Sequence, residues 1–584
     1  MEHLSEELII QILKRITRTS DLNSLSLVSK QLYTIDAEQR ATIRLDCGLA
    51  TEAFPTLCSR FPNLLKVEID YSGWTSGNGS QIDNQCLLFL SSCCTLLNDL
   101  TLSFCSNISD PGIACLTYCK KLMSLRLNSI PELTSSGLLL LAVGCKALSS
   151  VYLNDCKGIA GSTEWLEHLG VNGSLEELAV KNCKGIGQYH FLKFGSGWMK
   201  LQKFEYEIEQ GFWSFFHRDR DPSYKADTYR YDLLCESLKD LRLAHLVTEP
   251  EGPEIGLRFL LGKCKALERL CLEYVSGLID NDMIALSQTC KNLKSISLWL
   301  NPEHYNVGDD IVFRTGFTDE SLKALALNCP LLQAVELTFT GCEHWDPPEI
   351  GFTQEGLVSL VQSCPIRVLM LNSALIFNDD GMKALSTAQF LETLSLIDCD
   401  EVTDHGMRFA VHFPSLINLT LRYCYNVSDV GLSELVHAQK LESLVVGGCP
   451  MISEKGVQSA AKSVCYERAQ EAQDARRGFY YHSPPPPEFG RREVAGVRSS
   501  DSSKNRAALS SASPGDGANS SWFLYDIDAE QRATICVVSG PAIEALPVLF
   551  SRFPNLHKVE NNYSGWAPGN GSQIDNQGLR LLSF

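Results

Sequence analysis

The stretch LETLSLIDCDEVTDHGMRFA, residues 391–410, contains the unit that decides the fold, and LINLTLRYCYNVSDVGLSEL repeats it at residues 416–435. In LETLSL the apolar residues at the fourth and sixth positions share one face, as in a short strand. In EVTDHGMRFA, which follows, Thr403 is a residue type that caps helix N-termini, and the adjacent Asp404 interacts favourably with the helix dipole. Apolar residues then follow at helical spacing. Each unit therefore predicts a strand, a turn, a helix and a turn.

Hexamers of this kind recur fourteen times, from LLKVEI at Leu64 to LESLVV at Leu441. One unit cannot bury its own apolar faces, whereas stacked units form a continuous core. The repeats predict an α/β solenoid over residues 46–465, shaped like a horseshoe, with a parallel concave sheet and convex helices.

Most of the 23 cysteines follow the same period, since Cys399, Cys424 and Cys449 are 25 residues apart. No pair of CxxC motifs with the spacing of a zinc site is found. In a reducing compartment such cysteines pack as small apolar residues. We expect them in the core, and we expect no metal site.

The composition is that of an ordinary soluble chain, 44% apolar and 21% charged. No apolar run is long enough to span a bilayer, and MEHLSEELII carries acidic residues where a secretory signal needs a basic start. These features predict a cytoplasmic or nuclear protein, or one found in both. The formal charge of −18 disfavours nucleic acid and suits a basic protein partner.

Residues 1–33 depart from the repeat. LSEELIIQILKRI, from Leu4, places an apolar stripe on one helical face, and DLNSLSLVSKQLY, from Asp21, adds a second apolar run. Two or three short helices are expected. One interpretation is a cap that shields the end of the solenoid core.

A second interpretation rests on resemblance, because these residues are similar to the F-box pattern of LPxEL, an apolar helix, and LSLVCKxW. Ser5 stands where Pro is usual, Ser29 where Cys is common, and Leu32 near the usual Trp. The F-box is assigned to residues 1–45. By this resemblance the residues that bind the adaptor are Leu4, Glu7, Leu8, Ile12, Leu13, Leu25, Leu27, Val28 and Lys30.

The repeats resemble the cysteine-containing subtype of leucine-rich repeat. An F-box followed by such repeats is similar to the plant-type substrate receptors of Skp–cullin–F-box (SCF) ubiquitin ligases. The resemblance implies that the F-box binds a Skp-type adaptor and through it a cullin. It also implies that the repeats bind a target protein for ubiquitination and proteasomal degradation.

No GxSxG, HExxH, Walker loop or strand-associated GxGxxG motif is present, so we expect a non-catalytic subunit without a cofactor. Two alternatives remain open. One is a leucine-rich-repeat scaffold or inhibitor whose N-terminal helices are only a cap. The other is a small-molecule, hormone-like sensor on the same fold, although no dense Lys/Arg cluster for an inositol phosphate is visible.

Three long insertions follow strands: residues 207–232, 299–317 and 338–352. Aromatic and arginine side chains are enriched at interface hot spots. The alternative is that the aromatic residues only anchor their own loops. The predicted contacts with the target are Phe212, Trp213, Phe216, Arg218, Arg220, Tyr224, Tyr229, Trp299, Tyr305 and Trp345.

The C-terminal part contains a second copy of an N-terminal segment. Residues 466–524 are rich in Pro, Ser, Gly and charge and predict a disordered linker. Residues 525–584 then align without a gap with residues 33–92, and Asn561 replaces the apolar Ile69. A single incomplete repeat lacks a neighbour, so we expect no independent folding. The copy is interpreted as a remnant of gene fusion or of a misdrawn gene model, or alternatively as a swapped cap or dimer contact.

Overall fold

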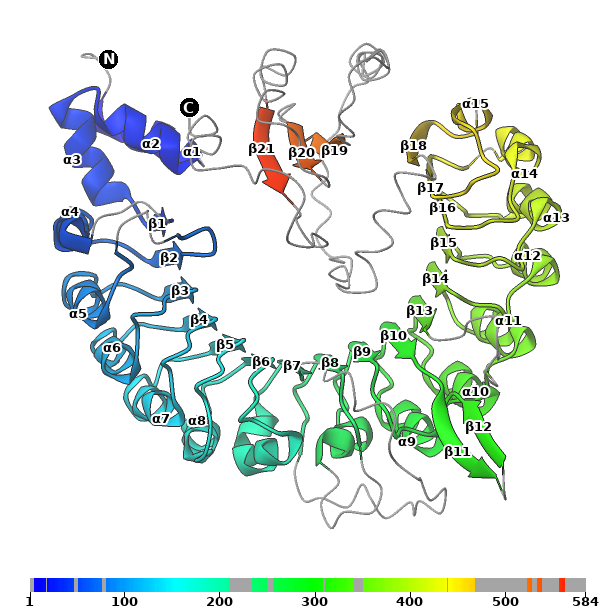
Figure 1. Ribbon diagram of the computed structural model, residues 1–584, viewed down its shortest axis with the longest axis horizontal. Coiled ribbons are helices and arrows are strands. Elements are labelled where there is room, and N and C mark those ends of the chain that lie inside the picture. The colour runs from blue at the N-terminus through cyan, green and yellow to red at the C-terminus, as the bar shows by residue number, and fades with distance from the viewer. Residues whose placement is uncertain are drawn as a thin grey trace, which may run out of the picture.

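The computed structural model describes residues 5–16, 18–46, 51–75, 80–208, 234–248, 256–307, 310–340, 350–438, 440–458, 460–467, 522–527, 533–537 and 556–561. The described residues between 5 and 467 form an open arc with strands on the concave side and helices on the convex side (Figure 1). The strands make one 16-stranded sheet in chain order, interrupted only where the hairpin β11–β12 is inserted. The predicted horseshoe solenoid is confirmed.

All fourteen predicted hexamers contain a strand of this sheet, and every pair of neighbouring strands is parallel. Two further strands, β1 and β18, extend the sheet slightly beyond both ends of residues 46–465. The strands are β1 (Thr42–Leu45), β2 (Lys66–Asp70), β3 (Asp99–Ser103), β4 (Ser124–Asn128), β5 (Ser150–Asn154), β6 (Glu177–Lys181), β7 (Lys203–Glu207), β8 (Asp240–Ala244), β9 (Arg269–Glu273), β10 (Ser295–Leu300), β13 (Ala334–Phe339), β14 (Val368–Asn372), β15 (Thr393–Ile397), β16 (Asn418–Arg422), β17 (Ser443–Gly447) and β18 (Ser463–Glu467).

The convex layer consists of α-helices and short 3-10 turns. Its α-helices are α4 (Phe54–Arg60), α5 (Asn84–Cys93), α6 (Asp110–Cys115), α7 (Ser135–Gly144), α8 (Glu164–Asn172), α9 (Asp280–Thr289), α10 (Asp319–Asn328), α11 (Gln354–Ser363), α12 (Asp379–Leu385), α13 (Asp404–Met407), α14 (Asp429–Ser433) and α15 (Glu454–Val457). The 3-10 helices are η1 (Thr51–Ala53), η2 (Leu116–Tyr118), η3 (Gln188–Met199), η5 (Gly256–Gly262), η6 (Arg408–His412) and η7 (Glu434–His437).

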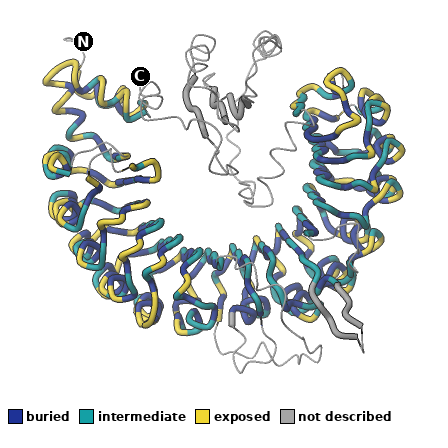
Figure 2. Tube along the Cα trace, in the orientation of Figure 1, coloured by how far each residue is buried: buried dark blue, intermediate teal, exposed yellow. Residues whose placement is uncertain are grey.

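A single hydrophobic core runs along the arc from Ile43 to Ala460, between the sheet and the helices (Figure 2). The two apolar positions read from LETLSL, Leu394 and Leu396, are fully buried, and Ser395 between them is only 4% exposed. Each strand is short, and its inward side chains pack against those of the repeats on either side. Burying a leucine of this kind contributes about 1.5–3 kcal/mol.

Aspartates at the helix starts connect neighbouring repeats. Asp379 accepts hydrogen bonds from the backbone N–H of Thr403 (2.8 Å) and from its hydroxyl (2.6 Å). Asp404 binds Ser428 in the same way. The expectation that Asp404 mainly serves the dipole of its own helix was therefore incomplete, because its carboxylate is occupied by the N-cap residue of the next repeat.

This connection explains the glycine two residues after Asp404 and Asp429, at Gly406 and Gly431. A Cβ added to Gly406 would lie 2.3 Å from Oδ1 of Asp379, closer than any real contact. The glycine of these repeats thus makes room for the carboxylate of the previous repeat, whereas Ser321 takes the equivalent place in α10 and its hydroxyl donates a 2.5 Å hydrogen bond to Asp280.

The described cysteines are free, and most are buried in the core. Cys424 lies with its Sγ 3.6 Å from the carbonyl oxygen of Leu396 in the preceding repeat. Burial raises the pKa of Cys399 to about 12, so this thiol stays protonated. The described residues include no group of three or more His, Cys, Asp or Glu side chains arranged to hold a metal ion.

The middle of the solenoid departs most from the regular repeat. The 3-10 helix η3 replaces an α-helix, and it packs Phe191 and Trp198 edge-on against Phe204 of β7. Further on, Arg258 of η5 forms a fully buried ion pair with Asp282 of α9, with contacts of 2.6 and 2.5 Å. Large rings and a paired charge therefore fill the space around these two 3-10 helices.

The second copy contains three described strands, β19 (Trp522–Ile527), β20 (Ala533–Val537) and β21 (Leu556–Asn561), which form a separate sheet. Thr534 pairs with Lys558 just as Thr42 pairs with Lys66 in the first copy. The central part of the predicted linker, 468–521, lies outside the described residues. That the copy does not fold independently stays a prediction.

Among the described residues, no helix has both the length and the apolar character needed to cross a bilayer.

Candidate adaptor and substrate surfaces

Three helices form the head at the N-terminal end of the arc: α1 (Glu6–Arg15), α2 (Thr19–Ser26) and α3 (Lys30–Gln39). Ser5 caps α1 by accepting a hydrogen bond from the backbone N–H of Leu8, and Ser29 caps α3 by accepting one from that of Leu32. The two serines that depart from the F-box pattern therefore have a local role as helix caps.

The head has a hydrophobic core of its own. Ile9, Leu13, Leu32 and Ile35 are between 3% and 6% exposed and form a cluster separate from the solenoid core. Helix α1 thus packs mainly on α3, within the head. A simple cap would place these side chains against the first repeat instead.

Several apolar residues of the head face outward. Leu8 and Ile12 of α1 are 49% and 47% exposed, and Leu27 and Val28, between α2 and α3, are 80% and 64% exposed. We name these four residues the exposed apolar set. The apolar area that they leave exposed gains nothing from folding and is available to another molecule.

The other predicted adaptor residues divide into three groups. Glu7 and Lys30 are exposed, as an adaptor contact requires. Leu13 is only 6% exposed, and Leu25 is half-buried against the head core, so both support the fold of the head from inside. Leu4 lies outside the described residues.

A polar junction joins the head to the solenoid, and sequence reasoning missed it. Asp36 and Arg40 of α3 are 2% and 6% exposed and form a two-bond ion pair of 3.0 and 2.8 Å. Arg60 of α4 lies 3.4 Å from Asp36 and stacks over the ring of Tyr33 at 3.8 Å. Arg40 lies over Phe61 at 4.8 Å. The i, i+4 spacing of Asp36 and Arg40 was the available sequence signal.

Of the predicted target contacts, the structure describes the side chain of Trp299 alone. Trp299 was expected at the start of a loop, but it lies within β10, because β13 continues to pair with this strand as far as Leu300 and Phe339. Tyr305 lies on β11 (Glu303–Val307), which pairs with β12 (Asp310–Arg314); this hairpin points away from the concave side in Figure 1. The remaining predicted contacts lie outside the described residues: Phe212, Trp213, Phe216, Arg218, Arg220, Tyr224, Tyr229 and Trp345.

Charged side chains on the concave face are largely paired, within a strand or between neighbouring strands. Glu205 of β7 lies 2.6 Å from Lys181 and 2.7 Å from Lys203. Burial alone would raise the pKa of Glu205, but the two lysines outweigh it and lower this pKa to about 2. Similar pairs join Lys66 to Glu68 and Arg269 to Asp240. Such ion pairs balance the charges of the concave face, so that neither sign of charge dominates it.

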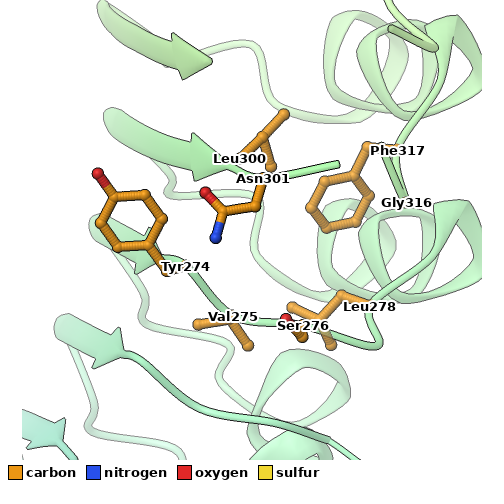
Figure 3. A pocket seen from close by; sticks show the side chains of 8 residues that line it. All are labelled: Tyr274, Val275, Ser276, Leu278, Leu300, Asn301, Gly316 and Phe317. Carbon is orange, nitrogen blue, oxygen red and sulfur yellow. The ribbon is translucent and has the colours of Figure 1, made fainter. Parts of the chain in front are cut away.

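A small pocket opens between the repeats of β9 and β10 (Figure 3). Tyr274 lies on its strand side and Phe317 on its helix side, with Ser276 and Asn301 between them. The cavity volume is about 10 Å³, which is room for a single water. This pocket is too small for a hormone-sized molecule.

Comparison with known proteins identifies the class of the head. Residues 1–35 match the family model of the F-box domain. The chain therefore carries an F-box domain followed by a leucine-rich-repeat solenoid.

Several solved structures are similar to the chain at low sequence identity. One is the complex of Rad7 and Elc1 in yeast, at 17% identity and a TM-score of 0.40, covering 80% of this chain and 98% of that chain. An internalin from Listeria monocytogenes matches at 14% identity and a TM-score of 0.37, covering 73% of this chain and 93% of its own. The TLR13–ssRNA13 complex matches at 17% identity and a TM-score of 0.40, covering 72% of this chain and 54% of that chain. These similarities are too distant to indicate function.

Proposed function

We propose that the chain is the substrate-recognition subunit of an SCF ubiquitin ligase, acting in the cytoplasm, the nucleus or both. The F-box binds a Skp-type adaptor and through it a cullin, and the solenoid binds a target protein for ubiquitination and proteasomal degradation. The observation that carries the proposal is the exposed apolar set on a head that has its own core and matches the F-box family.

The energetics favour a protein partner for the head. Leu8, Ile12, Leu27 and Val28 are apolar, close in the chain and largely exposed. Burying each against a partner contributes up to about 1.5–3 kcal/mol, which is the scale of an interface hot spot. Glu7 and Lys30, exposed beside them, supply polar groups for the rim of such an interface.

The chain needs no chemistry of its own for this role. A substrate receptor raises the effective concentration of the target beside a charged ubiquitin-conjugating enzyme. The junction around Asp36, Arg40 and Arg60 keeps the head in a defined orientation on the solenoid. That orientation sets where a bound target lies relative to the adaptor.

The scaffold alternative predicts that the head is only a cap. The separate core of the head argues against that role, since Ile9, Leu13, Leu32 and Ile35 do not belong to the core of the solenoid. The pocket of Figure 3, with room for one water, does not favour a small-molecule sensor over protein recognition.

The test is binding of a purified Skp-type adaptor to the full chain. The double variant Leu8→Asp, Val28→Asp is expected to lose at least tenfold in affinity, because it places two charges in an apolar interface. The matched control is Val171→Asp, Leu327→Asp, which alters side chains that are 79% and 83% exposed on the solenoid. Unchanged adaptor binding by the head variant, or no binding by the unaltered chain, would refute the proposal.

A further inference from the structure

The centre of the concave face carries a row of rings that is not part of the regular repeat. His245 follows β8, Tyr274 follows β9 and Trp299 lies on β10. His245 and Tyr274 stack at 5.2 Å between ring centroids, and Tyr274 meets Trp299 edge-to-face at 5.7 Å. All three side chains are half-buried. We name these three residues the aromatic row.

The backbone presents the first two rings by a bend that recurs along the sheet. His245 and Tyr274 have φ values of 56° and 50°, and Ser129, Asp155 and Ser373 adopt the same left-handed conformation after their strands. The N–H of His245 donates to the carbonyl of Glu273, and that of Tyr274 to the carbonyl of Trp299. The bend is therefore a general feature, and Phe104 and Tyr423 also carry rings there. At His245, Tyr274 and Trp299 the rings of neighbouring strands contact one another.

A carboxylate for which the described residues provide no ion pair lies beside the aromatic row. Glu336 of β13 accepts a hydrogen bond of 2.8 Å from the hydroxyl of Ser297, which in turn accepts one of 3.2 Å from Nε1 of Trp299. In the described part of the chain, Glu336 forms no ion pair, unlike Glu205 with its two lysines. Burial raises the pKa of Glu336, as expected for a carboxylate without a neutralising neighbour.

The cationic side chain on the neighbouring strands already forms an ion pair with another carboxylate. Arg242 of β8 pairs with Glu273 at 2.8 Å, and Glu273 is 3% exposed. Strand register places Glu336 beside Ser297, with Cys271 and Arg242 on the next two strands. One positive charge therefore faces two carboxylates at this point of the face.

We propose that the aromatic row and Glu336 together bind an arginine or lysine side chain of an extended segment of the target protein. This inference rests on the proposed function, since it specifies the chemistry of the target. The cation pairs with Glu336 and lies against the ring of Trp299 or Tyr274, which adds a cation–π interaction. The surplus of negative charge on the whole chain, −18, attracts such a basic segment.

The test uses a random nonapeptide display library selected on the immobilised full chain. Retained sequences are expected to be enriched in Arg or Lys. Glu336→Gln and Trp299→Ala are each expected to weaken binding of individual retained peptides at least about tenfold, the effect of losing one charge-assisted contact. The matched controls on the same face, Glu68→Gln on β2 and Tyr152→Ala on β5, are expected to leave binding unchanged.

A charge-reversal variant distinguishes the loss of a specific contact from misfolding as the cause of lost binding. Glu336→Lys is expected to reduce retention of basic peptides and to enrich acidic ones, a gain that an unfolded variant does not produce. Retention of sequences without basic residues, no retention of any sequence, or equal binding by Glu336→Gln would overturn the inference. So would enrichment seen only on a chain ending at residue 467, because the tail of the chain would then be the occupant.

The adaptor variant separates this inference from the proposed function. Leu8→Asp, Val28→Asp is expected to retain basic peptides as well as the unaltered chain does while losing the adaptor. Peptide binding without adaptor binding would refute the ligase role alone, and adaptor binding without peptide selectivity would refute the basic-segment inference alone.

Discussion

The head and the solenoid use the same kind of apolar helix in opposite ways. In the solenoid every repeat has neighbours, so residues such as Leu394 and Leu396 are completely buried within the chain. In the head, Ile9 is 3% exposed while the adjacent Leu8 is 49% exposed. Neighbouring repeats bury the apolar surface of the solenoid, whereas part of the apolar surface of the head stays exposed for a second protein to bury. Variants in the two regions should therefore affect different properties.

The largest effect is expected from the buried ion pair of the solenoid. Asp282→Ala leaves the guanidinium of Arg258, 1% exposed, without its carboxylate and is expected to cost about 4 kcal/mol of unfolding free energy. Denaturant unfolding measures the loss, and adaptor binding by the head should persist below the transition. The control Asp240→Ala breaks the more exposed pair with Arg269 and should cost less than about 1 kcal/mol. Equal losses in both variants would contradict the account.

The next effect tests the separate core of the head. Ile9→Ala is expected to destabilise the head by about 3 kcal/mol, whereas Leu8→Ala should change it by less than about 0.5 kcal/mol. Hydrogen exchange of the amides in α1 and α3 measures both. If exchange in the Ile9 variant also became faster in strands β2 and β3, the two cores would unfold together. That result would contradict the separation of the head core from the solenoid core.

A smaller effect is expected where neighbouring repeats interlock. Gly406→Ala places a methyl group against the carboxylate of Asp379 and is expected to cost about 2 kcal/mol by thermal unfolding. The double variant with Asp379→Ala removes the clash together with the hydrogen bonds to Thr403. Its cost should be clearly below the sum of the single costs. Strict additivity would show that the two side chains do not meet.

The smallest effect is a dependence of stability on pH at the concave face. Glu205 is ionised in the folded chain down to a pKa of about 2, below its ordinary value of 4.5. Its pairing with Lys181 and Lys203 therefore stabilises the fold above pH 4.5, and this contribution is lost as the pH falls toward 2. Glu205→Gln should cost about 1 kcal/mol at pH 7, since the lysines are partly exposed. A stability difference from the unaltered chain that stays constant down to pH 2 would be inconsistent with this pairing.

Much of the solenoid follows directly from the spacing of its leucines, because a 25-residue unit with alternating apolar positions has few other ways to bury them. The edge strands β1 and β18 were missed, since TIRL and SVCYE lack the full hexamer pattern. Trp299 was assigned to a loop because the hexamer ends at Leu298. The extra pairing of Trp299 with Thr338 depends on a neighbouring strand, which local pattern does not reveal.

The head shows a different limit of sequence reasoning. The apolar stripe was correctly read as helical, but periodicity does not tell which side faces inward. Leu13 belongs to the interior and Leu8 to the surface, although both fit the same stripe. Likewise Asp404 has the right position to serve its own helix, and only the stacking distance of the repeats assigns it to Ser428 of the next one.

The most direct test of the central claim is hydrogen–deuterium exchange of the full chain with and without a purified Skp-type adaptor. The account predicts new protection in residues 6–15 and 27–30, with exchange in the concave strands unchanged. Protection that falls on the concave strands instead, or no protection of the head at saturating adaptor, would contradict it.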